Sequence, residues 1–479
     1  MDFPIFHNDI FGNRAIIAVI ATLHVLINHG LAVGLMPLVA VIEWHGQRTA
    51  DPRWDRLAYR ILFVAFIITT TVGAMTGVGI WLSASLINPY AIGSLIRVFF
   101  WGWFIEWLVF ITEVCLILAY FQTWKRWTTG PAKRRHIRLG FALGLFSWIT
   151  MAIIVSILGF MMDPGNWMTE RTLWAGFTNP IYLPQLAFRT PLALAMAGVV
   201  ASFLTILMLP RSDPFRGQAI QALNLWTLVF VPLTLAGGWW YASVVPTTMT
   251  ENLATALLTM QFETWQSDFI ALIIGTTALL YLIAQVAVFR PSWVPGAGYV
   301  VALGAVIWLT GHFERVREFV RKPYVIGQYM YANGMRVDDY PLLQRDGVLA
   351  HATYSHPLTP QERAGAPAER LEALQRGKDV FMVTCSRCHT GQGVNSTTAR
   401  FEALFPNAEW DRDLLADYTT NMHGARPYMP PFPGTREEAL ALSDFLIHLR
   451  SARAPIAGAQ NGGIALNPFL TPKIAEAGR

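Results

Sequence analysis

Residues 385–389 read Cys385-Ser386-Arg387-Cys388-His389, and this stretch decides how the C-terminal part of the chain must fold. Two thiols three positions apart can add to the two vinyl groups of one porphyrin, and the adjacent imidazole becomes an axial ligand of its iron. The alternative is a redox-active or zinc-binding Cys-x-x-Cys. A zinc site needs a second ligand pair and a thioredoxin-like motif needs a βαβ setting, and the sequence offers neither. The motif therefore predicts covalently bound haem c, which bacteria attach outside the cytoplasmic membrane.

The composition is that of a membrane protein. Of the 479 residues 53% are hydrophobic and only 14% are charged, which is too apolar for a soluble protein of this length. The net charge of +5 is modest, and the basic residues lie in short loops between apolar runs, so no nucleic-acid partner is expected. Cys115, the third cysteine, stands alone in an apolar run and is expected to be a small buried hydrophobe. The first apolar run is long enough to span a bilayer, so no cleavable signal peptide is expected.

Apolar runs long enough to cross a hydrocarbon core of about 30 Å recur along the first two thirds of the chain. The fold class they predict is all-α: a polytopic transmembrane bundle of about eight helices, followed by a small all-α cytochrome c domain. The last run is the shortest. The predicted crossings are residues 15–42, 57–86, 98–121, 137–162, 185–209, 218–245, 266–289 and 296–312.

The loops between these runs indicate the orientation, because cytoplasmic loops retain Lys and Arg. Basic residues concentrate after the first, third, fifth and seventh runs, whereas the intervening loops carry far fewer. Both chain ends are therefore expected outside, on the side that the haem motif requires. The basic loops contain Arg48, Arg53, Arg56 and Arg60, then Lys125, Arg126, Lys133, Arg134, Arg135 and Arg138, then Arg211 and Arg216, and finally Arg290.

The composition changes after the eighth run, so we divide the chain into a transmembrane haem-binding domain (1–312), a surface helix and linker (313–368), a cytochrome c domain (369–454) and a tail (455–479). Residues 313–324 mix charge with aromatics, as a helix at a membrane surface or a solvated linker does. Within the cytochrome c domain, a helix over 369–384 leads into the haem motif. A second helix is predicted over Glu437–Arg450, and the tail is expected to be poorly ordered.

Ionisable residues lie inside two predicted spans, where burial costs several kcal/mol unless a partner compensates: His24 and His29 in the first, Glu106 and Glu113 in the third. His24 lies about 15 Å inward from Arg14 and Glu106 about 13 Å inward from Arg97, so the two share a depth. Glu113 follows Glu106 by two helical turns, about 10 Å further in on the same face. This arrangement suits an iron ligand with a proton-delivering acid behind it. A satisfied core histidine and a glutamate pair that only bridges helices are the alternatives.

The segment Tyr428-Met429-Pro430-Pro431-Phe432-Pro433 resembles the distal loop of a class I cytochrome c. In that family the loop presents a methionine to the haem iron, and a C-terminal helix packs across the helix that carries the Cys-x-x-Cys-His motif. The resemblance implies that His389 is the proximal ligand and Met429 the distal one, a pair that raises the reduction potential. Met422 and His423 remain alternative distal ligands.

The membrane part is similar to subunit I of the cytochrome bd oxygen reductases over roughly residues 10–245. The resemblance implies that His24 is the axial ligand of a high-spin haem b, that Glu106 is a ligand of the oxygen-reactive haem and that Glu113 belongs to the proton path. The residues that carry it are Ala21-Thr22-Leu23-His24-Val25-Leu26, Gly30-Leu31-Ala32-Val33-Gly34, Glu43-Trp44, Gly73-Ala74-Met75-Thr76-Gly77, the run from Phe104 to Glu113, Asp163-Pro164-Gly165-Asn166-Trp167 and Asn179-Pro180-Ile181.

The chain also departs from that family. Arg189 stands where the family's fifth helix carries the histidine of its low-spin haem, and a guanidinium cannot ligate iron but can pair with a haem propionate. The long quinol-binding loop after the sixth helix is replaced by a short connection, residues 246–266. This resembles the divergent, haem c-bearing branch of the superfamily. His7, His29 and His312 are the remaining candidates for a relocated low-spin haem.

The expected function is that of a membrane terminal oxidase in the bacterial cytoplasmic membrane. An extracytoplasmic haem c would accept electrons from a cytochrome or other donor, and haem b with haem d or a second haem b would reduce O2. A second membrane subunit of bd type, or a second copy of the chain, is expected as partner. Two alternatives stay open: an electron-transfer subunit without oxygen chemistry, and nitric oxide reduction at the same centre.

Overall fold

The computed structural model describes residues 5–253, 266–406 and 408–451. The chain divides into two compact units. The helical unit runs from Ala15 to Leu253 and from Ser267 to Val337, and the second unit joins the N-terminal residues up to Arg14 with the chain from Asp338 onward. The structure is 77% helical, which confirms the predicted all-α class. The predicted tail, 455–479, lies outside the described residues.

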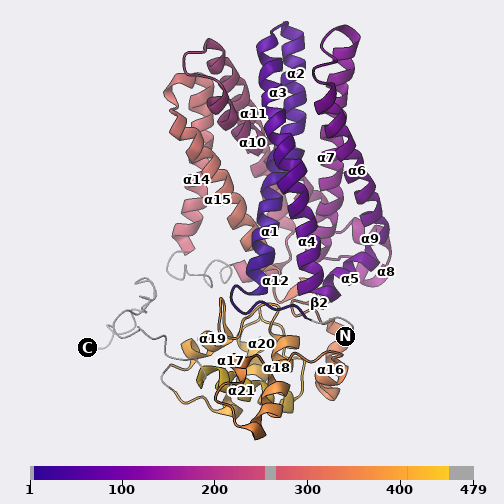
Figure 1. Cartoon of the computed structure of the whole chain (residues 1–479), viewed down its shortest axis with the longest axis vertical. Helices are drawn as coiled ribbons and strands as arrows, with labels where there is room; N and C mark the ends of the chain where they lie inside the picture. The colour runs from indigo at the N-terminus through magenta and orange to yellow at the C-terminus, as the bar shows by residue number, and fades with distance from the viewer. Residues whose placement is uncertain (1–4, 254–265, 407, 452–479) are drawn as a thin grey trace, which may run out of the picture. The chain divides into compact units, whose positions relative to one another are not determined.

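Among the described residues, eight helical segments are long and apolar enough to cross a membrane, which confirms the predicted number. Their long helices run side by side in Figure 1. The first segment comprises α1 (Asn13–Ile27), the π-helical η1 (Asn28–Val33) and α2 (Leu35–Thr49); the second comprises α3 (Pro52–Ile68), the π-helical η2 (Thr69–Gly73) and α4 (Ala74–Ile87). The other six are α6 (Phe100–Thr123), α7 (Gly130–Met162), α10 (Tyr182–Met208), α11 (Pro214–Val244), α14 (Gln266–Phe289) and α15 (Gly296–Val320).

Two of the tight turns between spans follow from aspartate caps. Ala50 ends α2 in the left-handed region with a φ of 53°, and the Asp51 carboxylate then accepts the backbone N–H of Arg53 at 2.9 Å. Asp213 caps α11 in the same way, accepting the N–H of Phe215 at 2.9 Å. Each aspartate is followed by a proline, whose fixed φ suits the first helical position. Short polar loops therefore return the chain directly into the next span.

The two π-helical segments, η1 and η2, contact one another. Helix α10 also packs tightly where η1 joins α2. A Cβ added at Gly34, the residue between them, would lie only 2.0 Å from the Ala193 carbonyl oxygen of α10. Such π-helical turns are frequent at functional sites. The sequence predicted continuous helices here and did not predict the widened turns.

A buried polar network joins four helices of the unit. Glu43 on α2 is fully buried, and its carboxylate lies 2.6 Å from Nζ of Lys133 and 2.6 Å from Nδ1 of His136, both on α7. The hydroxyl of Tyr120 on α6 donates to the same carboxylate at 2.6 Å. Lys133 also pairs with Asp55 on α3.

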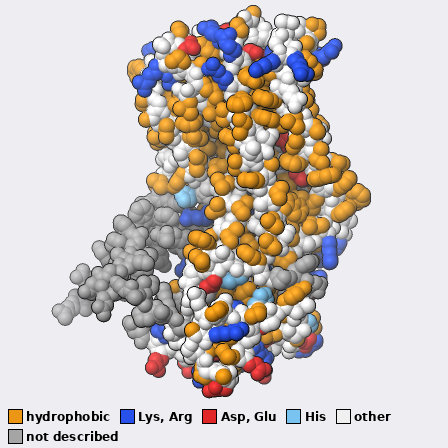
Figure 2. Space-filling model, in the orientation of Figure 1, with side chains coloured by type: hydrophobic (Ala, Val, Ile, Leu, Met, Phe, Trp, Pro, Cys, Tyr) orange, Lys and Arg blue, Asp and Glu red, His pale blue; other side chains and the backbone are white. Residues whose placement is uncertain are grey.

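Figure 2 shows Lys and Arg side chains gathered at one end of the helical unit and hydrophobic side chains along its flank.

Helix α6 is the least buried of the eight spans, with 11% of its most apolar window buried. Cys115 on this helix is exposed, so the prediction that it is buried was wrong. The physical reason is that an apolar residue in a membrane span need not face the protein core, because lipid is also an apolar environment.

Helix α15 corrects a second prediction. The charged segment after residue 312 is not a separate surface helix, because α15 continues through it to Val320. Glu314 is only 8% exposed there, and it is paired with Arg189 and with Arg317. Because both ion pairs compensate its charge, Glu314 can stay buried within α15.

Short elements complete the helical unit: α5 (Pro89–Val98), α8 (Trp167–Glu170), α9 (Leu173–Phe177), α12 (Thr247–Thr250), the 3-10 turn η3 (Pro291–Trp293), and the antiparallel strands β1 (Tyr324–Ile326) and β2 (Met330–Tyr331). The second unit contains α16 (Tyr340–Asp346), α17 (Pro360–Arg363), α18 (Leu371–Thr384), α19 (Thr397–Leu404), α20 (Arg412–Ala425) and α21 (Arg436–Ser451), with 3-10 turns η4 (Val337–Asp339), η5 (Leu349–His351) and η6 (Ala368–Arg370).

Helices α18 and α21 cross closely, as the resemblance to class I cytochromes c predicted. A Cβ at Gly377 of α18 would lie 2.1 Å from the Ala441 carbonyl oxygen of α21, so only glycine allows this approach. The two predicted helices, 369–384 and 437–450, correspond to these elements.

The connector before α18 is hydrogen-bonded to the domain that follows it. Glu438, which is 2% exposed, accepts the backbone N–H groups of Val348 and Leu349, both at 2.9 Å. Asp379 accepts the N–H of His356 at 2.6 Å and the hydroxyl of Ser355 at 2.8 Å. These buried carboxylates fold the connector onto the haem-motif domain.

Candidate functional site

The haem motif forms a turn at the end of α18. The N–H groups of Cys388 and His389 both donate to the Cys385 carbonyl at 3.0 Å. Ser386 and Arg387 between them are buried, whereas the two cysteines and the histidine are partly exposed. The three residues that must reach a porphyrin are therefore the accessible ones.

His389, the predicted proximal ligand, is oriented by a backbone carbonyl. Nδ1 of His389 lies 3.1 Å from the carbonyl oxygen of Asn395, which can only accept, so Nδ1 carries the proton and Nε2 is left for the iron. Burial lowers the pKa of His389 to about 4, so the ring is neutral at neutral pH. Burial also raises the pKa of the Cys385 thiol to about 11. These residues fit a covalently attached haem.

The loop that carries Met429 is held from both sides. Nδ1 of His423 on α20 donates to the Met429 carbonyl at 2.6 Å. On the other side, the Tyr340 hydroxyl donates to the Pro431 carbonyl at 3.2 Å and the Gln344 amide to the Phe432 carbonyl at 3.1 Å. His423, which the sequence left open as a distal ligand, thus supports the backbone of Met429.

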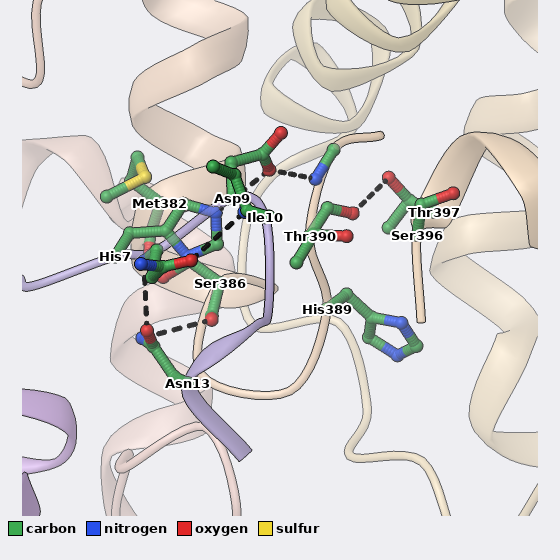
Figure 3. A network of polar contacts seen from close by, with 12 residues as sticks. His7, Asp9, Ile10, Asn13, Met382, Ser386, His389, Thr390, Ser396 and Thr397 are labelled. Carbon is green, nitrogen blue, oxygen red and sulfur yellow. Dashed lines mark hydrogen bonds and ion pairs between the residues drawn. The ribbon is translucent and has the colours of Figure 1, made fainter. Parts of the chain in front are cut away.

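His7 lies beside the haem motif, in the second unit. Its Nε2 is 3.1 Å from Asp9 (Figure 3), and its ring stands edge-on to Phe381 of α18 with centroids 5.8 Å apart. His7 is engaged within the haem-motif domain, so the structure does not support it as a ligand of a haem in the membrane.

His24 on α1 has the hydrogen bonding of a metal ligand. Its Nδ1 lies 3.2 Å from the Thr76 hydroxyl of α4, and that hydroxyl donates to the Val72 carbonyl at 2.8 Å. The hydroxyl therefore accepts from Nδ1, and the lone pair remains on Nε2. A Cβ at Gly77 would lie 3.2 Å from Cε1 of His24, so glycine gives the ring its space. The residues fit a haem at this position.

Glu106 and Glu113 differ in their surroundings. Glu113 accepts the Ser147 hydroxyl at 2.6 Å and the Thr150 hydroxyl at 3.3 Å, both from α7. Glu106 is half-buried, and within the described ranges no hydrogen bond to its carboxylate is present. Among the same residues no hydrogen bond or ion pair joins either glutamate to His24. The free carboxylate of Glu106 fits a ligand position, and the hydroxyl-bonded Glu113 fits a proton path.

Arg189 on α10 is 1% exposed and lies between two partners. Nη1 donates to Nε2 of His29 at 3.1 Å, and Nη2 to Oε1 of Glu314 at 2.8 Å. His29 also donates from Nδ1 to the Val25 carbonyl at 3.1 Å, so both of its ring nitrogens are occupied and it does not fit as a haem ligand. Nε of Arg189 is buried and has no hydrogen-bond partner within the described part of the chain. His312 stands edge-on to Trp308, with centroids 4.3 Å apart.

Two family models match the chain. The model for cytochrome bd terminal oxidase subunit I covers residues 13–274, more than half of the sequence. The chain belongs to this family. A second model, cytochrome c oxidase, cbb3-type, subunit III, matches residues 372–446 of the bd-family chain. The predicted fusion of a bd-type membrane domain with a cytochrome c domain is confirmed, and the two families imply haem b and haem c.

The bd-family fold is also found among solved structures. The structure of the bd oxidase from Geobacillus thermodenitrificans aligns with a TM-score of 0.58 and 16% identity, covering 70% of this chain and 93% of that chain. At this identity the likeness shows the fold alone. No curated protein matches the sequence.

Sequence reasoning missed two groups of residues in this bd-family chain. Glu43 and His136 were visible as ionisable residues within or beside apolar runs, and their burial could have been inferred from that signal. Glu314 was assigned to a surface helix because charged neighbours surround it. Its spacing of three residues from Arg317 was the signal for a helical ion pair.

Proposed function

We propose that the chain is the catalytic subunit of a cytochrome c-dependent terminal oxidase, which accepts electrons at an extracytoplasmic haem c and uses them at haems in the membrane to reduce O2. The observation that carries the proposal is the pair Glu106 and Glu113, on one face of α6 in a bd-type bundle fused to a haem c motif. Glu106 is half-buried and accepts no hydrogen bond from the described residues, which suits ligation. Glu113 behind it accepts two hydroxyls, which suits proton delivery. A module that only carries electrons has no need of this pair.

At the entry site, Cys385 and Cys388 would anchor haem c, with His389 as proximal and Met429 as distal ligand. Asn395 holds His389 in the tautomer that exposes Nε2, and His423 fixes the backbone of Met429. Bound there, haem c supplies one-electron transfer, and haem b with haem d or a second haem b supplies oxygen binding and reduction.

In the membrane, His24 would ligate a haem b through Nε2, and Glu106 would ligate the reactive haem. Glu113 would pass protons toward Glu106, with Ser147 and Thr150 as the hydroxyls that accompany it. Arg189 would meet a haem propionate through Nε, the one nitrogen that neither His29 nor Glu314 occupies.

An even number of spans, with basic loops at one end of the bundle, supports a location in the bacterial cytoplasmic membrane with both chain ends on the periplasmic side. The family description, subunit I, supports a second membrane subunit as partner; a second copy of the chain is the alternative. The electron donor would be a periplasmic cytochrome or another carrier, because residues 246–266 are too short for a quinol loop.

Haem extraction combined with a carbon monoxide difference spectrum tests the proposal. Pyridine haemochrome analysis should find haem c together with haem b, and carbon monoxide should change the spectrum of the reduced protein. If carbon monoxide leaves the reduced spectrum unchanged and only low-spin haems are found, the chain is an electron-transfer subunit without oxygen chemistry.

A further inference from the structure

The N-terminal residues 5–13, which we call the N-terminal strap, belong to the same compact unit as the haem motif, although 382 residues separate Asp9 from Gly391. Residues 5–12 precede the bd-type match at 13–274 and lie far from the cytochrome c match at 372–446. Neither family therefore accounts for this segment.

The strap is closed by its own hydrogen bonds. The Asn8 side chain accepts the N–H groups of Ile10 at 3.1 Å and Phe11 at 2.9 Å. The Asn13 amide donates to the Phe6 carbonyl at 2.7 Å and accepts the N–H of Asn8 at 3.1 Å. These hydrogen bonds within the strap fix its local backbone shape.

The strap binds the haem motif and the loop that follows it through three hydrogen bonds, of which the one between Asn13 and Ser386 is drawn in Figure 3. Asp9 accepts the N–H of Gly391 at 2.6 Å, and the Ile10 carbonyl accepts the N–H of Val394 at 2.9 Å. The Asn13 amide approaches the Ser386 carbonyl at 3.4 Å. The first two contacts supply acceptors for the backbone N–H groups of Gly391 and Val394 in the loop.

The approach of the two backbones is too close for a side chain. A Cβ at Gly393 would lie 1.8 Å from the Asp9 carbonyl oxygen, and one at Gly391 would lie 3.0 Å from Cδ1 of Leu449. On that second side, the Gln392 amide donates to the Leu449 carbonyl of α21 at 2.5 Å. The loop is thus held between the strap and α21.

The loop in turn orients the proximal histidine. Val394, which the strap binds, is followed by Asn395, whose carbonyl accepts Nδ1–H of His389 at 3.1 Å. Asn395 has a φ of 58°, in the left-handed region that asparagine enters more readily than most other non-glycine residues. Its side chain also donates to the Cys388 carbonyl at 2.8 Å. The hydrogen bond to Nδ1 raises the basicity of the ligand and stabilises Fe(III).

We propose that the N-terminal strap is a positioning element for haem c, which holds the Asn395 carbonyl against His389 and thereby lowers the reduction potential of that haem. The proposal rests on His389 being the proximal ligand. Asp9 and Ile10 do not touch the ligand themselves: Asp9 acts through Gly391, and Ile10 through Val394 and the adjoining Asn395.

The test uses two substitutions that each disrupt the contact between the strap and the loop, Gly393→Ala and Asp9→Ala, in the full-length protein. Both should raise the potential of haem c in a redox titration and broaden the electron paramagnetic resonance signal of its ferric form, with haem c still attached in wild-type amount. Asp9→Asn keeps an oxygen that can accept the N–H of Gly391, so it should restore the wild-type potential and signal. Gly424→Ala is the matched control, because a Cβ there meets nothing within 4 Å.

Wild-type potentials and spectra in both Gly393→Ala and Asp9→Ala would overturn the proposal. So would an Asp9→Asn variant that behaves like Asp9→Ala, because the charge of Asp9 and not its hydrogen bond would then be responsible. If one variant fails to fold, the other still decides. Absence of haem c from the wild-type protein would instead refute the proposed function, so the two failures are distinguishable.

Discussion

Arg189 and Glu314 form an ion pair inside the helical unit, with 2.8 Å between Nη2 of the arginine and Oε1 of the glutamate. The pair fastens α15, the last span, to α10, the fifth. Arg317 adds a second contact to the same carboxylate at 2.9 Å. Glu314 therefore balances the buried Arg189 and the partly buried Arg317, and α15 lies beyond the residues that match the bd-type family model.

Replacing Glu314 by Gln should destabilise the helical unit by about 3–5 kcal/mol, because it leaves Arg189, which is 1% exposed, without the carboxylate that it pairs with. Thermal unfolding of the detergent-solubilised protein measures the change. Asp51→Asn is the control, since its partner Arg53 is 43% exposed and asparagine keeps an oxygen that can cap α3, so its cost should be less than about 1 kcal/mol. Equal shifts for the two variants would contradict the role of Glu314.

The sequence predicted the spans well because each is a long apolar run, and membrane insertion depends on length and hydropathy. The prediction failed at residue 313, because the charged residues that begin there indicated the end of the membrane helix, whereas α15 continues to Val320. The partner that makes Glu314 tolerable there, Arg189, lies 125 residues away, and no local pattern identifies it.

The haem motif could be recognised from sequence for the opposite reason, because its thiols and imidazole are adjacent along the chain. Its support was not predictable. The Ile10 carbonyl that binds Val394 and the His423 ring that binds the Met429 carbonyl both act through backbone atoms, which leave no trace in residue identity. Tertiary contacts of this kind appear only once the chain is folded.

Glu106→Gln should abolish oxygen uptake while sparing the absorbance of haem c, because an amide is a poor iron ligand and cannot transfer a proton as a carboxyl does. Oxygen uptake with an artificial electron donor measures the activity. Thr112→Val on the same helix is the control, since its hydroxyl bonds only to the Leu108 carbonyl within the described residues, and it should remain active. Full activity in Glu106→Gln would remove this residue from the mechanism.

Glu113→Gln should slow oxygen uptake by roughly 10²-fold, the lower range for loss of a positioned proton donor, without changing the haem content. Ser147→Ala removes only the 2.6 Å hydrogen bond to Glu113, so its effect should be smaller and in the same direction. Turnover with excess donor, followed together with the carbon monoxide spectrum, separates the two roles. A changed carbon monoxide spectrum in Glu113→Gln would show that this residue contacts the haem instead.

Met429→Ala should leave haem c attached but lower its reduction potential by on the order of 0.1 V, because a thioether ligand favours Fe(II). His423→Phe should act in the same direction but less strongly, since it removes the 2.6 Å hydrogen bond to the Met429 carbonyl and keeps the sulfur. Redox titration of the haem c band measures both. An unchanged potential in Met429→Ala, with a large shift in Met422→Ala, would assign the distal position to Met422.

Asp379 should make the stability of the haem c domain sensitive to acid. Burial opposes its charge, but hydrogen bonds from His356, Ser355 and Gln375 outweigh that cost and lower the pKa of the carboxyl below its ordinary value of 3.8. A carboxyl whose pKa is lowered by folding stabilises the folded state fully above 3.8, and this contribution is lost as the pH falls through the lowered value. The resistance of the full chain to urea unfolding, followed through the haem c band, should therefore fall as the pH drops below 3.8. Asp379→Asn cannot titrate, so it should flatten this profile, and an identical slope in the variant would assign the acid sensitivity to other carboxyls such as Asp9.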